Sequence, residues 1–212
     1  VAGRARSLVA IDGRSGSGKS TFADELAAAL RRSGLRTVRS TTDSFHRPRR
    51  ERLRRGPNSA QGYVDDSHQL EVIAEELLTP FAEGASEVLV AAFHEPSDAA
   101  DRRVAIVTND PTVLVFDGLF LQRSEFAARW DAVVYLSADR RLDRVWTTYL
   151  LADLPDDPVE RATALDDRLE RARWPRYRRG WARYVDAAGP ASNATMVIDN
   201  DDLARPRVLH EQ

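Results

Sequence analysis

The sequence lacks cysteine and contains one lysine and one methionine among its 212 residues. Without cysteine neither a disulfide nor a thiolate metal site can form, a composition compatible with a reducing cytoplasm. No apolar run approaches the roughly 18 residues that span a bilayer, and no signal peptide precedes the first apolar run, so we expect a cytoplasmic protein. The net charge of −2 provides no overall field toward polyanions, so we expect neither nucleic acid nor a membrane as partner.

The single lysine lies in a segment that matches the phosphate-binding pattern G-x-x-x-x-G-K-[ST]. An apolar run at residues 8–11 predicts a buried strand before it, and Phe22, Leu26 and Leu30 predict the apolar face of a helix after it. These flanks argue against a chance glycine-rich turn. We expect an ATP-binding P-loop made of Gly13, Arg14, Ser15, Gly16, Ser17, Gly18, Lys19, Ser20 and Thr21.

Every other basic residue is arginine, so lysine stands where a compact ammonium must sit among phosphates. We therefore expect Lys19 to reach the β- and γ-phosphates and Ser20 to ligate Mg²⁺. ATP and Mg²⁺ are the predicted cofactors.

Further along the chain, strands alternate with helices. Strand patterns occur at residues 37–41, 113–118, 132–136 and 195–198. Together with the first strand they predict one α/β domain over residues 1–212, with the P-loop NTPase fold, a parallel five-stranded sheet and helices on both faces.

The other segments predict additions to this sheet. Residues 44–63 are basic and rich in turn formers, which indicates a long acceptor-side loop, and residues 88–93 and 103–107 indicate a hairpin-like excursion. A small helical lid is expected at about residues 141–180. Further helices are expected at residues 67–78, 126–130, 139–151 and 159–185, the last one interrupted at Pro175.

Three aspartates follow predicted strands: Asp43, Asp117 and Asp199. A P-loop enzyme that phosphorylates a hydroxyl needs one carboxylate beside the acceptor and another at the metal. We assign Asp43 to the first role and Asp117, with Ser20, to the second. A turn-forming aspartate is the alternative interpretation of each.

The P-loop, residues 41–45 (Thr-Thr-Asp-Ser-Phe), residues 116–118 (Phe-Asp-Gly) and residues 197–200 (Val-Ile-Asp-Asn) together resemble the uridine kinase and pantothenate kinase group of P-loop kinases. The resemblance covers about residues 7–208, and bacterial uridine kinase-like proteins are the most similar. It implies a kinase acting on a small-molecule hydroxyl, with a nucleoside such as uridine or cytidine as the leading acceptor. Because related kinases often form dimers or tetramers, it is also compatible with a homo-oligomer.

The same resemblance implies roles for particular residues. Asp43 and Lys19 would be catalytic, with Asp43 as the base toward the acceptor hydroxyl. We expect Asp43, Phe45, His46 and Phe93 to bind the acceptor; His46 is a candidate because it lies beside Asp43, and a solvated loop histidine is the alternative. The ATP site would also include Arg144 and Asn200. The candidates for lid residues over the phosphates are Arg141, Arg144, Arg168, Arg171, Arg173 and Arg176. A nucleic-acid patch, or a solvated helix face whose arginines pair with the interleaved acids, is the alternative for the arginines of residues 161–183.

Some positions depart from the uridine kinase pattern. The second-substrate segment, with Tyr-Asp followed by Thr-His in uridine kinases, is here residues 93–96 (Phe-His-Glu-Pro), so pantothenate or a sugar is the alternative acceptor. A switch-type GTPase is disfavoured because residues 117–120 are not Asp-x-x-Gly and the single lysine cannot supply Asn-Lys-x-Asp. A nucleic-acid-binding ATPase that uses the arginine segments is the third alternative, and the net charge argues against it. A non-kinase P-loop ATPase also remains an alternative.

Overall fold

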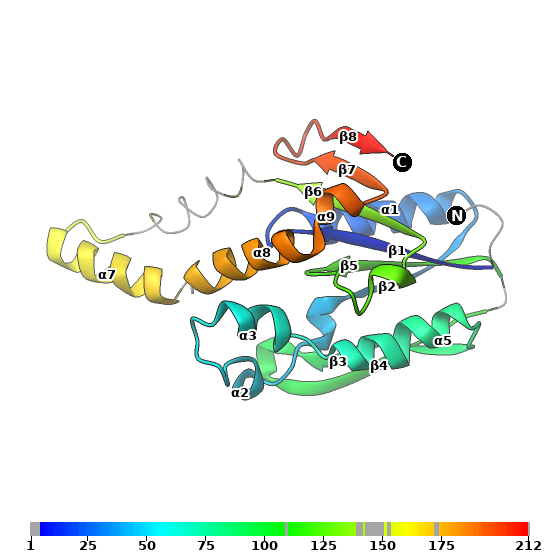
Figure 1. Ribbon diagram of the computed structural model, residues 1–212, viewed down its shortest axis with the longest axis horizontal. Coiled ribbons are helices and arrows are strands. Elements are labelled where there is room, and N and C mark those ends of the chain that lie inside the picture. Colours follow the sequence, from blue (N-terminus) through cyan, green and yellow to red (C-terminus); the bar gives the residue numbers. More distant parts are fainter. Residues whose placement is uncertain are drawn as a thin grey trace.

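The computed structural model describes residues 5–108, 110–138, 142, 151, 154–171 and 174–211. A six-stranded sheet with the order β2-β5-β1-β6-β7-β8 forms its centre (Figure 1). Its first five strands run parallel, which confirms the predicted parallel arrangement. They are β1 (Arg6–Gly13), β2 (Arg36–Thr41), β5 (Thr112–Gly118), β6 (Ala132–Ser137) and β7 (Met196–Asp199).

A sixth strand corrects the expected strand number. β8 (Arg207–Glu211) pairs antiparallel with β7 at the edge of the sheet. All its residues are exposed, so no face of this strand has to be apolar. Its sequence therefore shows neither the apolar run nor the apolar–polar alternation by which a strand is recognised.

The two faces of the sheet are covered differently. Helix α1 (Lys19–Arg32) lies on one face, where its buried Ala23 and Ala27 pack against β1 residues Val9 and Ile11. On the other face a larger, aromatic-rich core includes Phe45, Phe81, Phe116, Phe120 and Trp181. Successive side chains of β1 therefore point alternately to the core on one face of the sheet and to the core on the other face, as expected for a strand buried on both faces.

The second core is closed by a helical stretch and a hairpin. α4 (Leu70–Val72), a π-helical segment (Ile73–Leu78) and α5 (Thr79–Ala82) follow one another directly, so this stretch begins three residues later than expected. β3 (Glu87–His94) and β4 (Ala99–Ile106) form a separate antiparallel two-stranded sheet, as expected for a hairpin-like excursion.

The polar segment 44–63 is not a continuous loop. It contains α2 (Arg49–Arg52) and the start of α3 (Ala60–Asp65), and the 3₁₀ turn Thr42–Phe45 leads into it. The Ser59 hydroxyl accepts a hydrogen bond from the Gly62 N–H and so caps the N-terminus of α3. This cap stabilises a helix in a segment whose polar composition had indicated a loop.

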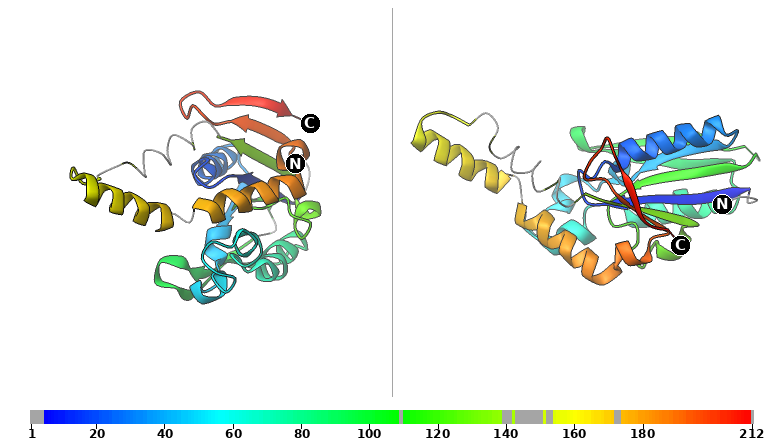
Figure 2. Two further views of the ribbon diagram at one scale, coloured as in Figure 1. Left: turned by 60° about the vertical axis from the view of Figure 1, so that its left-hand side comes forward. Right: turned by 90° about the horizontal axis from the view of Figure 1, so that it is seen from above.

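The C-terminal helical region consists of two helices, α7 (Pro158–Arg171) and α8 (Trp174–Ala188). Pro175 lies in the first turn of α8, where a helix tolerates proline. α8 packs along α3 and the sheet, whereas α7 extends away from the sheet in both views of Figure 2. Two shorter elements are the 3₁₀ turn Ala127–Arg129, within the helix expected at residues 126–130, and α9 (Pro190–Asn193).

The helix expected at residues 139–151 lies outside the described residues, except for positions 142 and 151. Among the described residues, the structure has no helix that is long and apolar enough to cross a bilayer.

Candidate active site

The P-loop connects the end of β1 to the start of α1, at the edge of the sheet where β5 and β6 also end. At Gly13 a Cβ atom would lie 2.6 Å from the Leu136 carbonyl oxygen, so a side chain is excluded there. Gly18, at the N-cap of α1, has the left-handed conformation that glycine tolerates. The N-terminus of α1 therefore faces the loop, an arrangement that binds phosphate.

Lys19 is folded over this loop. Its Nζ donates a hydrogen bond of 2.9 Å to the Arg14 carbonyl oxygen, and its side chain is almost buried. Burial lowers the pKa of Lys19, whereas the charges of Asp12, Asp43 and Asp117 act in the opposite direction. These carboxylates favour the ammonium form, which is the form that neutralises phosphate.

Ser20 and Asp117 are in direct contact. The Ser20 hydroxyl donates a hydrogen bond of 2.7 Å to Asp117 Oδ2, and the Asp117 side chain is 1% exposed. A hydroxyl and a carboxylate oxygen are ligands that Mg²⁺ prefers, so the two residues fit the expected metal pair. At Gly118 a Cβ atom would lie 2.2 Å from Thr42 Oγ1, so the ends of β5 and β2 can approach this closely only with glycine there.

Arg39, on β2, holds the other oxygen of Asp117. Its Nη2 lies 3.0 Å from Asp117 Oδ1, and its Nη1 donates a 2.8 Å hydrogen bond to the Val115 carbonyl oxygen. Our sequence analysis missed this residue. A charged residue in the middle of a predicted strand that ends at the site was the available signal, because such a charge needs a partner when it is partly buried.

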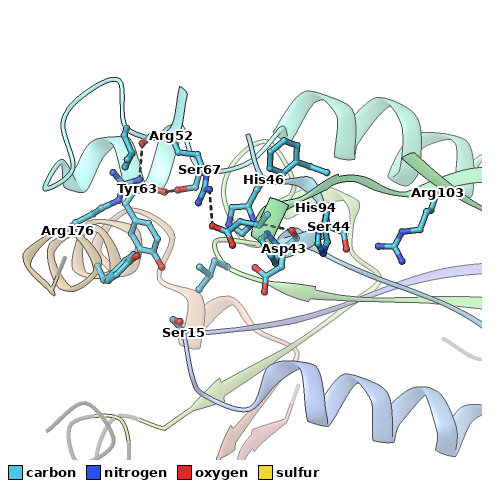
Figure 3. Close-up of a pocket in the computed structure, with 16 residues that line it drawn as sticks. Ser15, Asp43, Ser44, His46, Arg52, Tyr63, Ser67, His94, Arg103 and Arg176 are labelled. Atoms are coloured by element: carbon cyan, nitrogen blue, oxygen red, sulfur yellow. Dashed lines mark hydrogen bonds and ion pairs between the residues drawn. The ribbon is translucent and has the colours of Figure 1, made fainter. Parts of the chain in front are cut away.

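Two cavities share Asp43 in their lining, and Figure 3 shows the residues around the larger one. The smaller, about 290 Å³, is bordered by the P-loop with Lys19 and Ser20, and by Asp117. The larger, about 540 Å³, lies between the turn after β2, the hairpin β3–β4 and α8. Asp43 lines both, as do Ser15 and Leu119. A carboxylate at this junction can touch groups bound in either cavity.

Of the residues expected to bind the acceptor, some line the larger cavity and one does not. His46 and Phe93 line the larger cavity together with Asp43. Phe45, by contrast, is fully buried and packs against Phe116, with ring centroids 6.4 Å apart. This corrects the expectation that Phe45 contacts the acceptor: in the 3₁₀ turn its side chain points into the core, where its apolar area is removed from water.

The structure also describes Arg176 and Asn200. Arg176 lines the larger cavity, its Nη2 donates a 3.1 Å hydrogen bond to the Arg52 carbonyl oxygen, and its guanidinium lies over the Tyr63 ring. Asn200 is buried, and its amide donates a 2.7 Å hydrogen bond to the Ser17 carbonyl oxygen, so it supports the P-loop from behind. Arg141, Arg144 and Arg173, and the side chains of Arg168 and Arg171, lie outside the described part of the chain.

A buried acid below the P-loop was missed as well. The Asp12 side chain is inaccessible to solvent, and its Oδ1 accepts a 2.8 Å hydrogen bond from the Gly13 N–H. Its Oδ2 accepts hydrogen bonds from the Tyr184 hydroxyl and, at 3.1 Å, from Gln122 Nε2. Burial raises the pKa of Asp12, and these hydrogen bonds and the charge of Lys19 oppose the rise. Tyr184 and Gln122 lie far from Asp12 in the sequence, and no motif links them.

The sequence model of the phosphoribulokinase/uridine kinase family matches residues 8–148, which is most of the chain. The protein belongs to this family. Its members are kinases that phosphorylate alcohol groups and bind nucleotide at a P-loop, so this chain is a kinase, as the resemblance implied. No curated protein sequence matches the chain.

Solved structures agree with this family at the level of the fold. A possible uridine kinase from Bacillus stearothermophilus is 20% identical, with a TM-score of 0.69 over 93% of this chain and 90% of the other. A putative fructose transport system kinase from Silicibacter sp. TM1040 is 24% identical, with a TM-score of 0.60 over 86% and 85%. Phosphoribulokinase from Rhodobacter spheroides is 14% identical, with a TM-score of 0.57 over 92% and 71%.

Proposed function

We propose that this kinase transfers the γ-phosphoryl group of ATP to a hydroxyl group of a small molecule, with a nucleoside such as uridine or cytidine as the leading acceptor. The observation that carries the proposal is the position of Asp43, which borders both the P-loop cavity and the larger cavity. ATP phosphates bound at the P-loop and a hydroxyl bound in the larger cavity would meet at this carboxylate.

The residues at the junction supply what phosphoryl transfer requires, which is mainly positioning and neutralisation of charge. Lys19 contacts the phosphates, and Ser20 and Asp117 hold Mg²⁺. When bound, the metal neutralises charge on the phosphate oxygens. Asp43 orients the acceptor hydroxyl and accepts its proton as the oxygen attacks phosphorus. The positive end of the α1 helix dipole, at its N-terminus, also stabilises the negative charge on the phosphates.

The lining of the larger cavity supports a nucleoside. Tyr63, Phe93 and Tyr177 offer aromatic surfaces against which a base can pack, and His46 offers a polar group near Asp43. The cavity volume of about 540 Å³ is in the range of small-molecule sites.

A second acceptor class is favoured by a different observation. Three arginines, Arg52, Arg103 and Arg176, line the same cavity. Guanidinium groups pair well with carboxylates and phosphates, so an anionic acceptor such as pantothenate is the alternative. ATP consumption measured with uridine, cytidine, pantothenate and simple sugars distinguishes the two classes.

The assignment of Asp43 is tested by Asp43→Asn, which keeps the shape of the side chain and removes the base. We expect the ATP affinity to change by less than about 1 kcal/mol and single-turnover transfer to fall about a hundredfold or more. Calorimetry and rapid-quench measurements on the same variant measure the two quantities. Asp186→Asn, at an exposed position of α8, is the matched control. A parallel loss of both quantities would place Asp43 in the nucleotide–metal site, and no loss of either would remove it as the base.

A further inference from the structure

Two histidines from separate segments meet beside Asp43. His46 follows the 3₁₀ turn that carries Asp43, and His68 lies just before α4. An antiparallel β-bridge pairs the two residues, and their ring centroids are 4.6 Å apart. Backbone hydrogen bonds on both sides of the bridge, from Arg47 N to Ser67 O and from Gln69 N to Phe45 O, hold the segments together.

One potential ligand atom from each of Asp43, His46 and His68 lies within 4.8 Å of the others. We propose that these three residues form a binding site for a divalent transition metal such as Zn²⁺, separate from the Ser20–Asp117 pair. Two imidazoles and a carboxylate are a ligand set that suits Zn²⁺, Co²⁺ or Fe²⁺, whereas Mg²⁺ prefers oxygen ligands.

His68 provides the second observation for this site. Its side chain is 2% exposed, yet its Nε2 has no hydrogen-bond partner within the described part of the chain. Buried polar nitrogens are rarely left without a partner, and a bound cation would supply one.

The hydrogen bond of His46 determines which of its ring nitrogens is available to a metal. Its Nδ1 lies 3.0 Å from the Asp43 carbonyl oxygen, and because a carbonyl can only accept, Nδ1 carries the hydrogen. In the neutral ring the lone pair is then on Nε2. A hydrogen bond from the other ring nitrogen to a backbone carbonyl is the usual support of a metal-binding histidine.

The site is accessible and can close around an ion. Asp43 and His46 line the larger cavity, so an ion can reach these two ligands from it, whereas His68 is buried next to His46 (Figure 3 shows Asp43 and His46). Zn²⁺ bonds of about 2.0–2.1 Å place two ligand atoms at most about 4.2 Å apart. The exposed Asp43 side chain is free to rotate toward the two histidines, and three protein ligands leave a fourth position of a zinc ion open.

Occupation of this site would have one consequence that rests on the proposed function. A metal bound to the Asp43 carboxylate withdraws electron density from it and lowers its basicity toward the proton of the acceptor. Zn²⁺ would therefore inhibit phosphoryl transfer while ATP still binds at the P-loop.

The binding is tested directly with the full-length chain, without nucleotide and in excess Mg²⁺, so that the Ser20–Asp117 pair is not available to the probe. We expect saturable Co²⁺ binding with one equivalent, seen as visible absorption of a low-symmetry Co²⁺ complex, and its displacement by Zn²⁺. His46→Asn and His68→Gln should each weaken binding by about tenfold or more. His210→Gln, at an exposed position of β8, should not change it.

Circular dichroism shows whether each variant is folded. Because His68 is buried, the partly exposed His46 provides the variant that tests the site if His68→Gln unfolds. Absence of saturable Co²⁺ binding, or binding that His46→Asn leaves unchanged, would overturn the proposal.

Single-turnover assays with added Zn²⁺ separate this proposal from the proposed function. Co²⁺ binding together with Zn²⁺ inhibition supports both. Co²⁺ binding without inhibition supports the metal site and removes Asp43 as the base. Loss of transfer in Asp43→Asn with no Co²⁺ binding supports the kinase mechanism and overturns the metal site.

Discussion

Tyr184, on α8, donates a hydrogen bond to the carboxylate of Asp12, which lies 172 residues earlier at the end of β1. The Tyr184 hydroxyl also accepts a 3.0 Å hydrogen bond from the Gln122 N–H, so it serves as donor and acceptor at once. Through these contacts the helix that borders the larger cavity is joined to the residue that precedes the P-loop. The nucleotide side and the acceptor side of the site thus share one buried polar network.

The first prediction concerns this network. Tyr184→Phe leaves Asp12 and the Gln122 N–H each without one hydrogen bond, and we expect the free energy of unfolding to fall by about 1–3 kcal/mol. Urea denaturation measures it. The double variant with Asp12→Asn should deviate from additivity by about 0.5 kcal/mol or more. Additive effects would show that the contact carries no coupling energy.

The second prediction concerns pH. The folded-state pKa of Asp12 is raised above its ordinary value of 3.8, mainly by burial, against the hydrogen bonds from Tyr184, Gln122 and Gly13 and the charge of Lys19. Its contribution to stability is therefore fully present below pH 3.8 and is lost as the pH rises through the folded-state pKa. Asp12→Asn does not titrate. The unfolding free energy of the wild type minus that of the variant should fall as the pH rises from about 4 toward 8. A difference that is independent of pH would contradict the raised pKa.

The third prediction concerns Lys19. We expect Lys19→Ala to reduce phosphoryl transfer by several orders of magnitude while the fold persists, because the phosphates lose their cation. Lys19→Arg should be nearly as inactive, since the planar guanidinium does not fit a loop that surrounds a compact ammonium. Steady-state rates and circular dichroism measure the two effects. Substantial turnover in the arginine variant would show that charge alone is sufficient.

The fourth prediction concerns the support of the metal pair. Arg39→Gln frees one oxygen of Asp117, so we expect the Mg²⁺ concentration for half-maximal rate to rise about tenfold. Asp117→Asn should raise it further, because it removes the charged ligand. Arg36→Gln is the control, since this arginine on the same strand pairs with the exposed Asp110. If the wild type and Asp117→Asn needed the same Mg²⁺ concentration for half-maximal rate, Asp117 would not be a metal ligand, and another acidic residue would have to be.

The parts of the fold that follow from local sequence were predicted correctly. The P-loop and its flanking strand and helix depend on residues close together in the chain. The parallel strands are recognisable because burial on both faces requires continuous apolar runs. In a parallel sheet the carboxyl ends of the strands lie at the same edge, where ligands bind. Asp117 at the end of β5 therefore lies beside Ser20, which follows the end of the neighbouring β1.

The remaining parts depend on contacts that sequence spacing does not encode. Arg39 is recognised as the partner of Asp117 only when β2 is seen to pair with β5. His68 meets His46 through a β-bridge of one residue pair, which has no sequence pattern. Phe45 was misplaced because adjacent residues of a 3₁₀ turn point in different directions, and the spacing does not tell which side faces the cavity.

The outer wall of the larger cavity does not belong to the central sheet. Phe93, His94 and Arg103 come from the separate hairpin β3–β4, and Tyr63 from α3, whereas the P-loop, Ser20 and Asp117 depend on β1, α1 and β5. Under the proposed function, substitutions in the hairpin would therefore alter which molecule is admitted without disturbing the groups assigned to phosphate. In evolutionary terms, acceptor choice and phosphoryl chemistry would then be separable traits, and selection could change one while the other is kept.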